Sequence, residues 1–410
     1  MGTRQVDVVI VGGGPAGFAA AAPIAAAGFS TLVVEEHRRV GLPIQCSGLV
    51  TSRVLEMVPS GSELIHHEVE GVLVHDPRGR CLHVDGRRPR AYVIDRAGLD
   101  QCCQQSAIAA GATVEEGVRA TAVERTQRGV RLHLSASKGT TRTIDASLVI
   151  GADGVQSNVA RWMGLRRPRD LAAAVEWRGA GLQIDPRFVA VFIGTTVAPG
   201  FFGWAIPHGQ GHGAIGVGSC TSDTPALELL RRLTAQEGGY AGPMTTTFSR
   251  QQELCGVIPL DLVAKPYGDN VMTVGDAAGQ TKPLSGGGIY TGLVCGRICG
   301  QTAVGALGAH DLSADRLKRY AQAVDAGVGK ELRAAYRLRK VFRQLNDQQL
   351  SDLLETLDDR GLLQMVIAHG DIDFPGNLAA RMLRAAPALA RFTRPFLRAV
   401  LRPTTTLAPA

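Results

Sequence analysis

Three acidic side chains, Glu35, Asp153 and Asp276, each follow a short apolar run that is rich in β-branched residues. Runs of this kind are typical of strands buried on both faces of a parallel sheet. The carboxyl ends of such strands form the edge at which open α/β sheets bind their ligands. Three acids that converge on one crevice suit a long cofactor.

The segment before Glu35 must present backbone groups to that cofactor. An apolar strand over residues 8–11 leads into the spacing G-x-G-x-x-G, and alanine-rich helical sequence follows as far as Gly28. In this pattern the first glycine permits a tight turn, the second lets a pyrophosphate approach the backbone, and the third lets helix and strand pack closely. The helix N-terminus offers free N–H groups to the phosphates. The expected cofactor contacts are Gly12, Gly14, Pro15, Ala16 and Gly17.

Glu35 ends the second strand of this unit, over residues 31–34, and is expected to accept hydrogen bonds from a ribose. Glu36 stands beside it, so the ribose acid is uncertain by one position. An acid in either position disfavours a ribose 2′-phosphate. The ligand is therefore expected to be NAD-like or FAD-like, and the two later strand ends favour FAD.

Those later strand ends are the pairs Asp153-Gly154 and Gly275-Asp276. Together with the glycine turn, they resemble the FAD-dependent group that includes aromatic hydroxylases, flavin halogenases and geranylgeranyl reductases. The resemblance implies that Asp276 binds the ribityl chain of FAD. It also implies that Asp153 and Gly154 brace the pyrophosphate region.

Two further segments fit the same resemblance. "VIDRAGLDQCC" places Arg96 near the cofactor, the alternative being a surface salt bridge with Asp95 or Asp100. "PLSGGGIYTG" predicts a thin loop that opens a helix, whose N–H groups would face the flavin and stabilise its reduced form. The alternative is a purely structural glycine turn. The residues expected at the flavin are Gly286, Gly287, Gly288 and Ile289.

Two stretches indicate the chemistry. "GLPIQCSGLV" resembles the cysteine loop of geranylgeranyl reductases, with Cys46 in the motif position. "PGFFGWAIP" resembles the motif that lines their isoprenoid pocket, although Phe202 replaces a Tyr and Ile206 a Phe. The resemblance implies reduction of prenyl double bonds, with Cys46 positioning the substrate or relaying a proton. The alternative for Cys46 is an inert buried thiol. The expected pocket residues are Phe201, Phe202, Trp204, Ile206 and Pro207.

Other functions share these cofactor motifs. An aromatic or polyketide hydroxylase remains the main alternative. "FGWAIP" also approaches a flavin halogenase motif, but no lysine precedes Lys138 to handle hypohalous acid. An electron-transfer flavoprotein that reduces quinone usually carries an iron–sulfur cluster, and no set of four clustered cysteines occurs.

The electron donor is left open between NAD(P)H and a ferredoxin-like protein, because the chain has only one complete dinucleotide fingerprint. "GQGHGAIGVG" alternates like a strand and opens no helix. The prenyl carrier is also open. An ether lipid, a quinone tail, a chlorin alcohol and a polyprenyl phosphate all fit.

The expected fold is α/β: a Rossmann-like FAD-binding domain with an inserted β-rich substrate domain and a C-terminal helical region. We predict a discontinuous FAD domain over 1–65, 92–168 and 262–330. The substrate domain would take 66–91 and 169–261, and the helical region 331–410. Its arginines stand among Leu and Phe, which suits the surface of an anionic bilayer, or helices docked on the core with solvated arginines. They are Arg381, Arg384, Arg391, Arg394, Arg398 and Arg402.

The composition of the chain limits the partners and the metal sites that we expect. The chain has 410 residues, a formal net charge of +7 and a pI near 9.1, which permits anionic partners. We expect no nucleic-acid partner, because aromatics are only 5% and no basic stripe interleaves with them. No metal site is expected, since the eight cysteines are scattered. We expect a cytoplasmic protein, either free or peripheral on the membrane, with no membrane-spanning segment.

Overall fold

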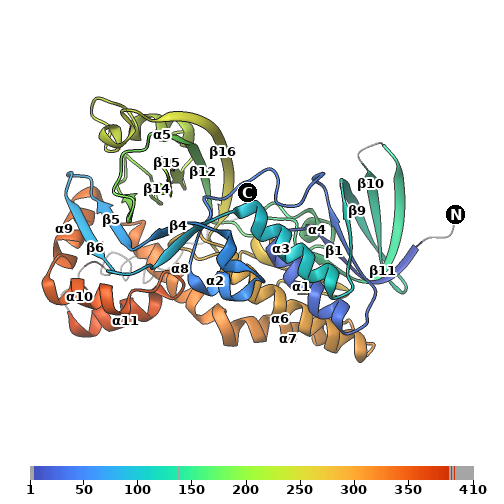
Figure 1. Ribbon diagram of the computed structural model, residues 1–410. Coiled ribbons are helices and arrows are strands. Elements are labelled where there is room, and N and C mark those ends of the chain that lie inside the picture. Colours follow the sequence, from blue (N-terminus) through green and yellow to red (C-terminus); the bar gives the residue numbers. More distant parts are fainter. Residues whose placement is uncertain (1–3, 137–138, 387–388, 390–391, 393–410) are drawn as a thin grey trace, which may run out of the picture.

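A computed structural model describes residues 4–136, 139–386, 389 and 392, and Figure 1 shows its arrangement. An eight-stranded sheet holds the cofactor motifs. Its parallel part buries Val8, Val9 and Ile10 completely, as the apolar runs predict. The parallel strands, in sheet order, are β18 (Val271–Thr273), β11 (Thr141–Gly151), β1 (Arg4–Val11), β2 (Thr31–Glu35) and β8 (Thr113–Glu116). The antiparallel additions are β17 (Tyr267–Gly268), β10 (Gly129–Ala136) and β9 (Val118–Thr126).

Helices cover one face of this sheet, and two of them pack unusually closely. A Cβ atom on Gly296 would lie 2.5 Å from the carbonyl oxygen of Ala16, and one on Gly300 would lie 2.4 Å from that of Ala20. Glycine is therefore required where these two helices cross. The covering helices are α1 (Pro15–Ala26), α3 (Arg96–Ala109), α6 (Ile289–Gly308) and α7 (Ala314–Val324).

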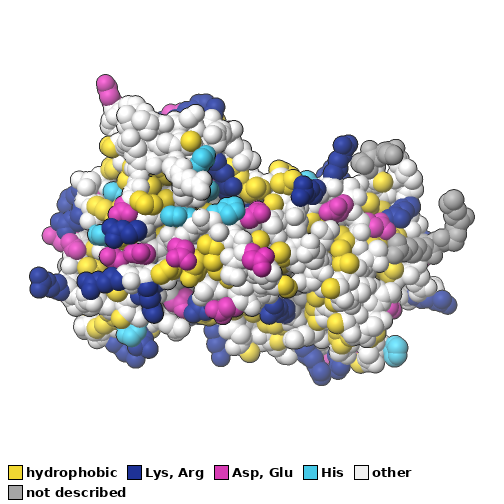
Figure 2. Space-filling view, in the orientation of Figure 1, with side chains coloured by type: hydrophobic (Ala, Val, Ile, Leu, Met, Phe, Trp, Pro, Cys, Tyr) yellow, Lys and Arg dark blue, Asp and Glu magenta, His cyan; other side chains and the backbone are white. Residues whose placement is uncertain are grey.

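A second, seven-stranded sheet forms the β-rich part, which stands above the level of the helices in Figure 1. Helix α5 (Ala226–Leu233) packs on it, and Figure 2 shows several histidines gathered below this part. The sheet runs β16 (Ser249–Pro259), β12 (Leu171–Ala180), β15 (His212–Ser219), β14 (Gly203–Gly209), β13 (Phe188–Phe192), β5 (Gly71–His75) and β6 (Cys81–Asp85). A small sheet, β3 (Leu49–Val50), β7 (Ala91–Ile94) and β4 (Ile65–Val69), lies beside it.

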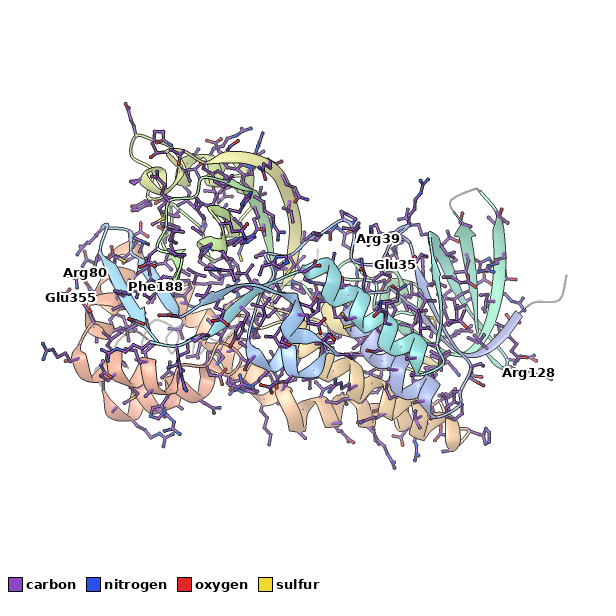
Figure 3. All side chains as sticks on the ribbon, in the orientation of Figure 1. Glu35, Arg39, Arg80, Arg128, Phe188 and Glu355 are labelled. Atoms are coloured by element: carbon purple, nitrogen blue, oxygen red, sulfur yellow. The ribbon has the colours of Figure 1, made fainter. Side chains whose placement is uncertain are left out.

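The C-terminal helices pack against the β5–β6 hairpin through an apolar cluster. Arg80 of the hairpin loop lies 3.4 Å from Glu355, and Figure 3 labels this pair. Arg381 and Arg384 belong to the last described helix, and the other four predicted membrane-facing arginines lie outside the described residues. The helices are α8 (Lys330–Phe342), α9 (Asp347–Leu357), α10 (Arg360–His369) and α11 (Pro375–Ala385), preceded by a π-turn, η4 (Asp325–Gly329).

Short elements complete the chain: α2 (Ser52–Met57), α4 (Asn158–Trp162), η1 (Gly61–Leu64), η2 (Gly242–Thr245) and η3 (Gly275–Ala278). The predicted α/β class, with a β-rich part and C-terminal helices, is confirmed. The domain boundaries stay predictions. Among the described helices, none is both long enough and apolar enough to cross a bilayer.

Candidate active site

The glycine turn between β1 and α1 divides into packing and open positions. Gly12 has φ +109°, and a Cβ there would lie 2.2 Å from the carbonyl oxygen of Ala152. A Cβ on Gly17 would lie 2.2 Å from the carbonyl oxygen of Gly12. A Cβ on Gly14, by contrast, would meet no protein atom within 4 Å. The missing side chain at Gly14 therefore leaves a free space at the start of α1, where a phosphate can approach the backbone.

Glu35, at the end of β2, faces this turn. Its Oε2 accepts a hydrogen bond from the backbone N–H of Gly13 at 2.7 Å, and its Oε1 accepts one from the N–H of His37 at 2.9 Å. The neighbouring Glu36 is exposed and pairs with Arg119 at 3.2 Å. Of the two acids that the sequence left open, only Glu35 is held at the glycine turn, and Figure 3 labels it there.

Arg96 and Asp276 are two charged residues near the turn, and the charge of Arg96 acts on Asp276. Arg96 begins α3 and donates to Asp100, with its side chain only 14% exposed, so this is not a surface salt bridge. Its Nε is buried and finds no partner among the described residues. Burial raises the pKa of Asp276 to about 6, with Arg96 acting in the opposite direction. No described side chain or N–H donates to the Asp276 carboxylate. Both groups can therefore bind a polar ligand.

The Asp153-Gly154 pair shapes the adjoining turn. Asp153 accepts from the Ser157 hydroxyl at 2.6 Å and from the N–H of Val159 at 3.0 Å, so its carboxylate is used to begin α4. Gly154 has φ +75°, and a Cβ there would meet nothing within 4 Å. The bonds from Ser157 and Val159 to Asp153 hold the turn that contains Gly154. The backbone of Gly154 stays open to a ligand beside the glycine turn.

The triple glycine precedes α6, as the sequence predicted, and Gly288 is its N-cap. A Cβ on Gly286 would lie 3.0 Å from Cζ of Phe201, and one on Gly287 would lie 2.8 Å from Cε of Lys282. A Cβ on Gly288 would lie 3.1 Å from Oδ1 of Asp276. Each glycine is packed closely against a different neighbour in the protein itself. The loop therefore joins the cofactor acid to the aromatic motif.

The aromatic motif is buried as one cluster. Phe201 and Phe202 stack with ring centroids 4.3 Å apart, and Trp204 meets Phe202 edge-on at 6.0 Å. Trp204 and Ile206 project from β14 onto Val69 and other apolar residues of β4 and β7. Pro207 is also buried. The structure brings four of the five predicted pocket residues together, Phe201, Phe202, Trp204 and Ile206, with Phe201 against the triple glycine. Pro207 follows Ile206 in β14 and is not part of this group.

A buried carboxylate that the sequence analysis missed joins this cluster to the cysteine loop. Glu176, on β12, is 5% exposed. It accepts from the Trp204 indole N–H at 2.8 Å and from Nε of Arg178 at 2.9 Å. Arg178 in turn donates to the backbone carbonyl of Cys46. Cys46 itself is half-buried, and its Sγ accepts from the N–H of Gly48 at 3.5 Å. The only feature of the sequence that could have indicated this residue is that Glu176 is a single acid within the apolar stretch "AAAVEW".

Comparison with known proteins assigns the family. A model of the FAD-binding domain matches residues 5–221. The digeranylgeranylglycerophospholipid reductase 2 of Methanopyrus kandleri is 30% identical over 399 residues, covering 95% of this chain and 99% of that relative. The protein of the same name from Methanothermobacter thermautotrophicus is 31% identical over 382 residues, covering 87% and 93%. This chain belongs to the digeranylgeranylglycerophospholipid reductase family.

The fold agrees with that family. The crystal structure of a geranylgeranyl bacteriochlorophyll reductase-like protein from Thermoplasma acidophilum superposes with a TM-score of 0.84 at 22% identity, covering 96% of this chain and 99% of that one. The protein is an FAD-dependent oxidoreductase. The residues present fit FAD, because Gly14 and Gly154 leave the backbone open while Nε of Arg96 is buried without a partner among the described residues.

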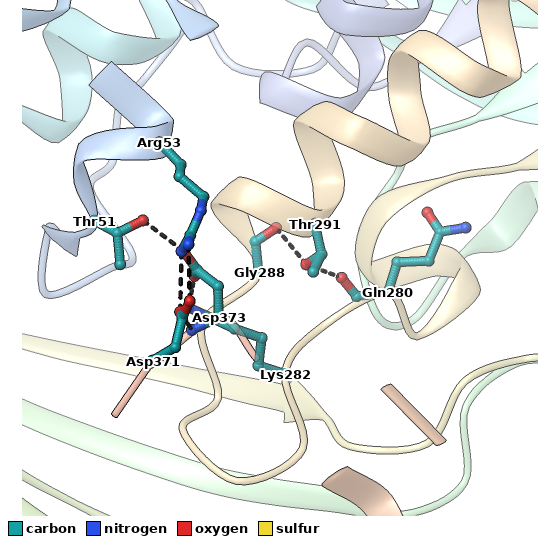
Figure 4. Close-up of polar contacts among 8 residues, drawn as sticks. All are labelled: Thr51, Arg53, Gln280, Lys282, Gly288, Thr291, Asp371 and Asp373. Carbon is teal, nitrogen blue, oxygen red and sulfur yellow. Dashed lines mark hydrogen bonds and ion pairs between the residues drawn. The ribbon is translucent and has the colours of Figure 1, made fainter. Parts of the chain in front are cut away.

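A clamp that no sequence motif predicts links the C-terminal region to the triple-glycine loop, as Figure 4 shows. The Asp373 side chain is fully buried and lies 2.7 Å from Nζ of Lys282. It also accepts from Thr51 at 2.7 Å and from Arg53 at 2.9 Å, and Arg53 makes two further bonds to Asp371. No local motif predicts this cluster, because its members come from three distant segments of the chain.

Proposed function

We propose that this protein is an FAD-dependent reductase that saturates C=C bonds of a geranylgeranyl-type prenyl chain on a lipid, a quinone or a related carrier. The observation that supports it most is the Glu176 bridge, which places the Cys46 loop beside the aromatic cluster. The names of the relatives agree with this reaction class. Hydroxylase and halogenase functions share the FAD motifs, but no observation on the substrate side favours them.

An isolated alkene offers no carbonyl to polarise, so exclusion of water and local stabilisation of charge matter most. When bound, reduced FAD supplies the hydride. Phe201, Phe202 and Trp204 would exclude water from the prenyl chain, and the Trp204 face would stabilise positive charge that develops on it. The Cys46 thiol would position the chain or donate the proton that completes the reduction. Gly286 to Gly288 and Ile289 would hold the flavin edge.

The remaining partners belong to the same proposal. The reductant would be NAD(P)H or a ferredoxin-like protein. The arginines of the C-terminal region would make peripheral contact with the membrane from which a cytoplasmic enzyme draws its lipid substrate. Arg381 and Arg384 are both exposed on α11, which supports this proposal. The test is to measure binding of the protein to vesicles that contain anionic lipid and to vesicles that lack it. Stronger binding to the anionic vesicles supports the proposal.

The reaction is tested directly with the FAD-loaded protein. We would reduce it with dithionite under anaerobic conditions, add a geranylgeranyl lipid and record product masses. Mass gains of about 2 Da for each reduced bond support the proposal, since each reduction adds one hydride and one proton. An unchanged lipid, together with oxygen-dependent turnover of an aromatic compound, would replace the proposal with the hydroxylase alternative.

The role of Cys46 has its own test. Cys46→Ala should keep FAD bound and lower turnover at least ~10-fold, because proton transfer by a positioned group typically contributes that much or more. Cys255→Ala is the matched control, since Cys255 is exposed on β16. Equal turnover in the two variants would make Cys46 a packing residue.

A further inference from the structure

A polar cavity opens beside the Cys46 loop. Its volume is 470 Å³, and strands β12, β14, β15 and β16 supply its walls. Two glycines and five polar residues line it, and none of these carries a carboxylate. The polar lining residues are Arg178, His208, His212, Gln251 and Gln252. Such a lining suits a compact anion and is unsuited to a prenyl chain.

The cavity holds unused hydrogen-bonding groups. The Nε2 atom of His208 is buried without a partner in the described part of the chain. Burial and the charge of Arg178 lower the pKa of His208 to about 4, so its ring is neutral at physiological pH and keeps one N–H donor. Arg178 uses Nε on Glu176 and one terminal nitrogen on Cys46. No described residue accepts from its other terminal nitrogen, so a ligand can take that donor.

Arg178 also fixes where this cavity lies relative to the proposed reaction. One of its nitrogens bonds the backbone of Cys46, and Glu176 links it to Trp204. A group bound to Arg178 in the cavity is therefore close to both parts of the proposed prenyl site, the Cys46 loop and the aromatic cluster. Guanidinium and imidazole donors match the oxygen atoms of a phosphate.

We propose that this cavity binds the phosphate group at the polar end of the prenyl substrate, an inference that rests on the reductase function proposed above. Arg178 would be the charged ligand and His208 a neutral donor. The phosphate would anchor one end of the substrate, while its apolar chain enters the aromatic cluster. A nicotinamide nucleotide is the other source of phosphate, and the experiment separates the two.

The test places a negative charge in the cavity without changing side-chain size. Gln252→Glu should raise KM for geranylgeranyl phosphate about tenfold and leave KM for geranylgeraniol unchanged, because only the first carries an anion. Gln236→Glu is the control: it makes the same change on an exposed loop outside the cavity. Equal effects on both prenyl compounds, or no effect on either, would overturn the proposal. An increase confined to KM for NADPH would also overturn it.

A binding measurement separates this inference from the reductase proposal. Calorimetry of geranylgeranyl phosphate with the oxidised, FAD-loaded protein needs no turnover. If the wild-type protein reduces neither compound yet binds the phosphate about tenfold more tightly than Gln252→Glu does, the cavity assignment stands and the reductase proposal fails. Equal affinity in both proteins would remove the assignment even if the reaction is observed.

Discussion

The cofactor edge and the substrate side of this site are built in different ways. The cofactor edge consists mainly of backbone, opened by Gly14 and Gly154 in short local motifs. The substrate side consists of side chains from distant segments, joined through Glu176 and Asp373. We therefore expect mutations in the two regions to have different effects. Changes at the edge should affect FAD binding, whereas changes on the substrate side should affect stability or turnover with FAD retained.

The largest effect is expected from Gly14→Asp. A side chain there has room, and Asp is a favoured N-cap residue, so the FAD-free protein should keep its melting temperature. The added carboxylate would occupy the phosphate space and repel the cofactor. We expect FAD affinity to fall at least ~1000-fold, about 4 kcal/mol, measured by flavin fluorescence titration. Retained affinity would show that FAD does not use the turn.

Asp373→Asn should test the substrate side through stability. It leaves Lys282 buried beside a neutral amide, so we expect a loss of about 3 kcal/mol in the free energy of unfolding, measured in urea. Asp371→Asn is the comparison: this partly exposed residue pairs with Arg53 and accepts from the N–H of Asp373, a bond that an amide oxygen can keep, so the change should cost ~1 kcal/mol or less. Similar losses would mean that burial of the Asp373 charge is unimportant.

The same pair predicts a pH dependence. Burial disfavours the Asp373 charge, but Lys282 and three hydrogen bonds outweigh it and hold the pKa of Asp373 below its usual value. The stabilisation is then present above the unfolded pKa of about 4 and is lost as pH falls through the folded value. Wild-type stability should therefore decrease more steeply on acidification than that of Asp373→Asn. Parallel curves would contradict this.

Glu176→Gln should lower turnover about tenfold with FAD affinity unchanged, because an amide has one acceptor for two donors. The released Cys46 loop should also change its rate of reaction with a thiol reagent, which a general loss of stability would not reproduce. Glu253→Gln is a matched control: Glu253 binds the Trp177 indole and Arg250 in the same way, at the surface. Equal turnover in both variants would remove the positioning role of Glu176.

The last prediction concerns Asp276, at the cofactor edge. Because its pKa is raised to about 6, its burial stabilises the FAD-free fold below pH ~4 and loses that contribution as pH rises through 6. Asp276→Asn should therefore stabilise the FAD-free protein by about 3 kcal/mol at pH 7, because the pKa is raised by about two units, with no difference near pH 4. FAD affinity should fall in the same variant. If the variant is more stable but binds FAD as tightly as the wild type, Asp276 is not part of the cofactor edge.

The sequence by itself determined the parallel strands, the glycine turn and the start of α6, because strand burial, tight turns and helix N-termini depend on residues close together in the chain. It also placed Cys46 and the aromatic motif on the substrate side, though only through resemblance. Only the tertiary structure separated Glu35 from Glu36 and revealed the Glu176 bridge and the Asp373 clamp. Those contacts join residues up to 322 positions apart, and such partners are selected by packing, which no local pattern records.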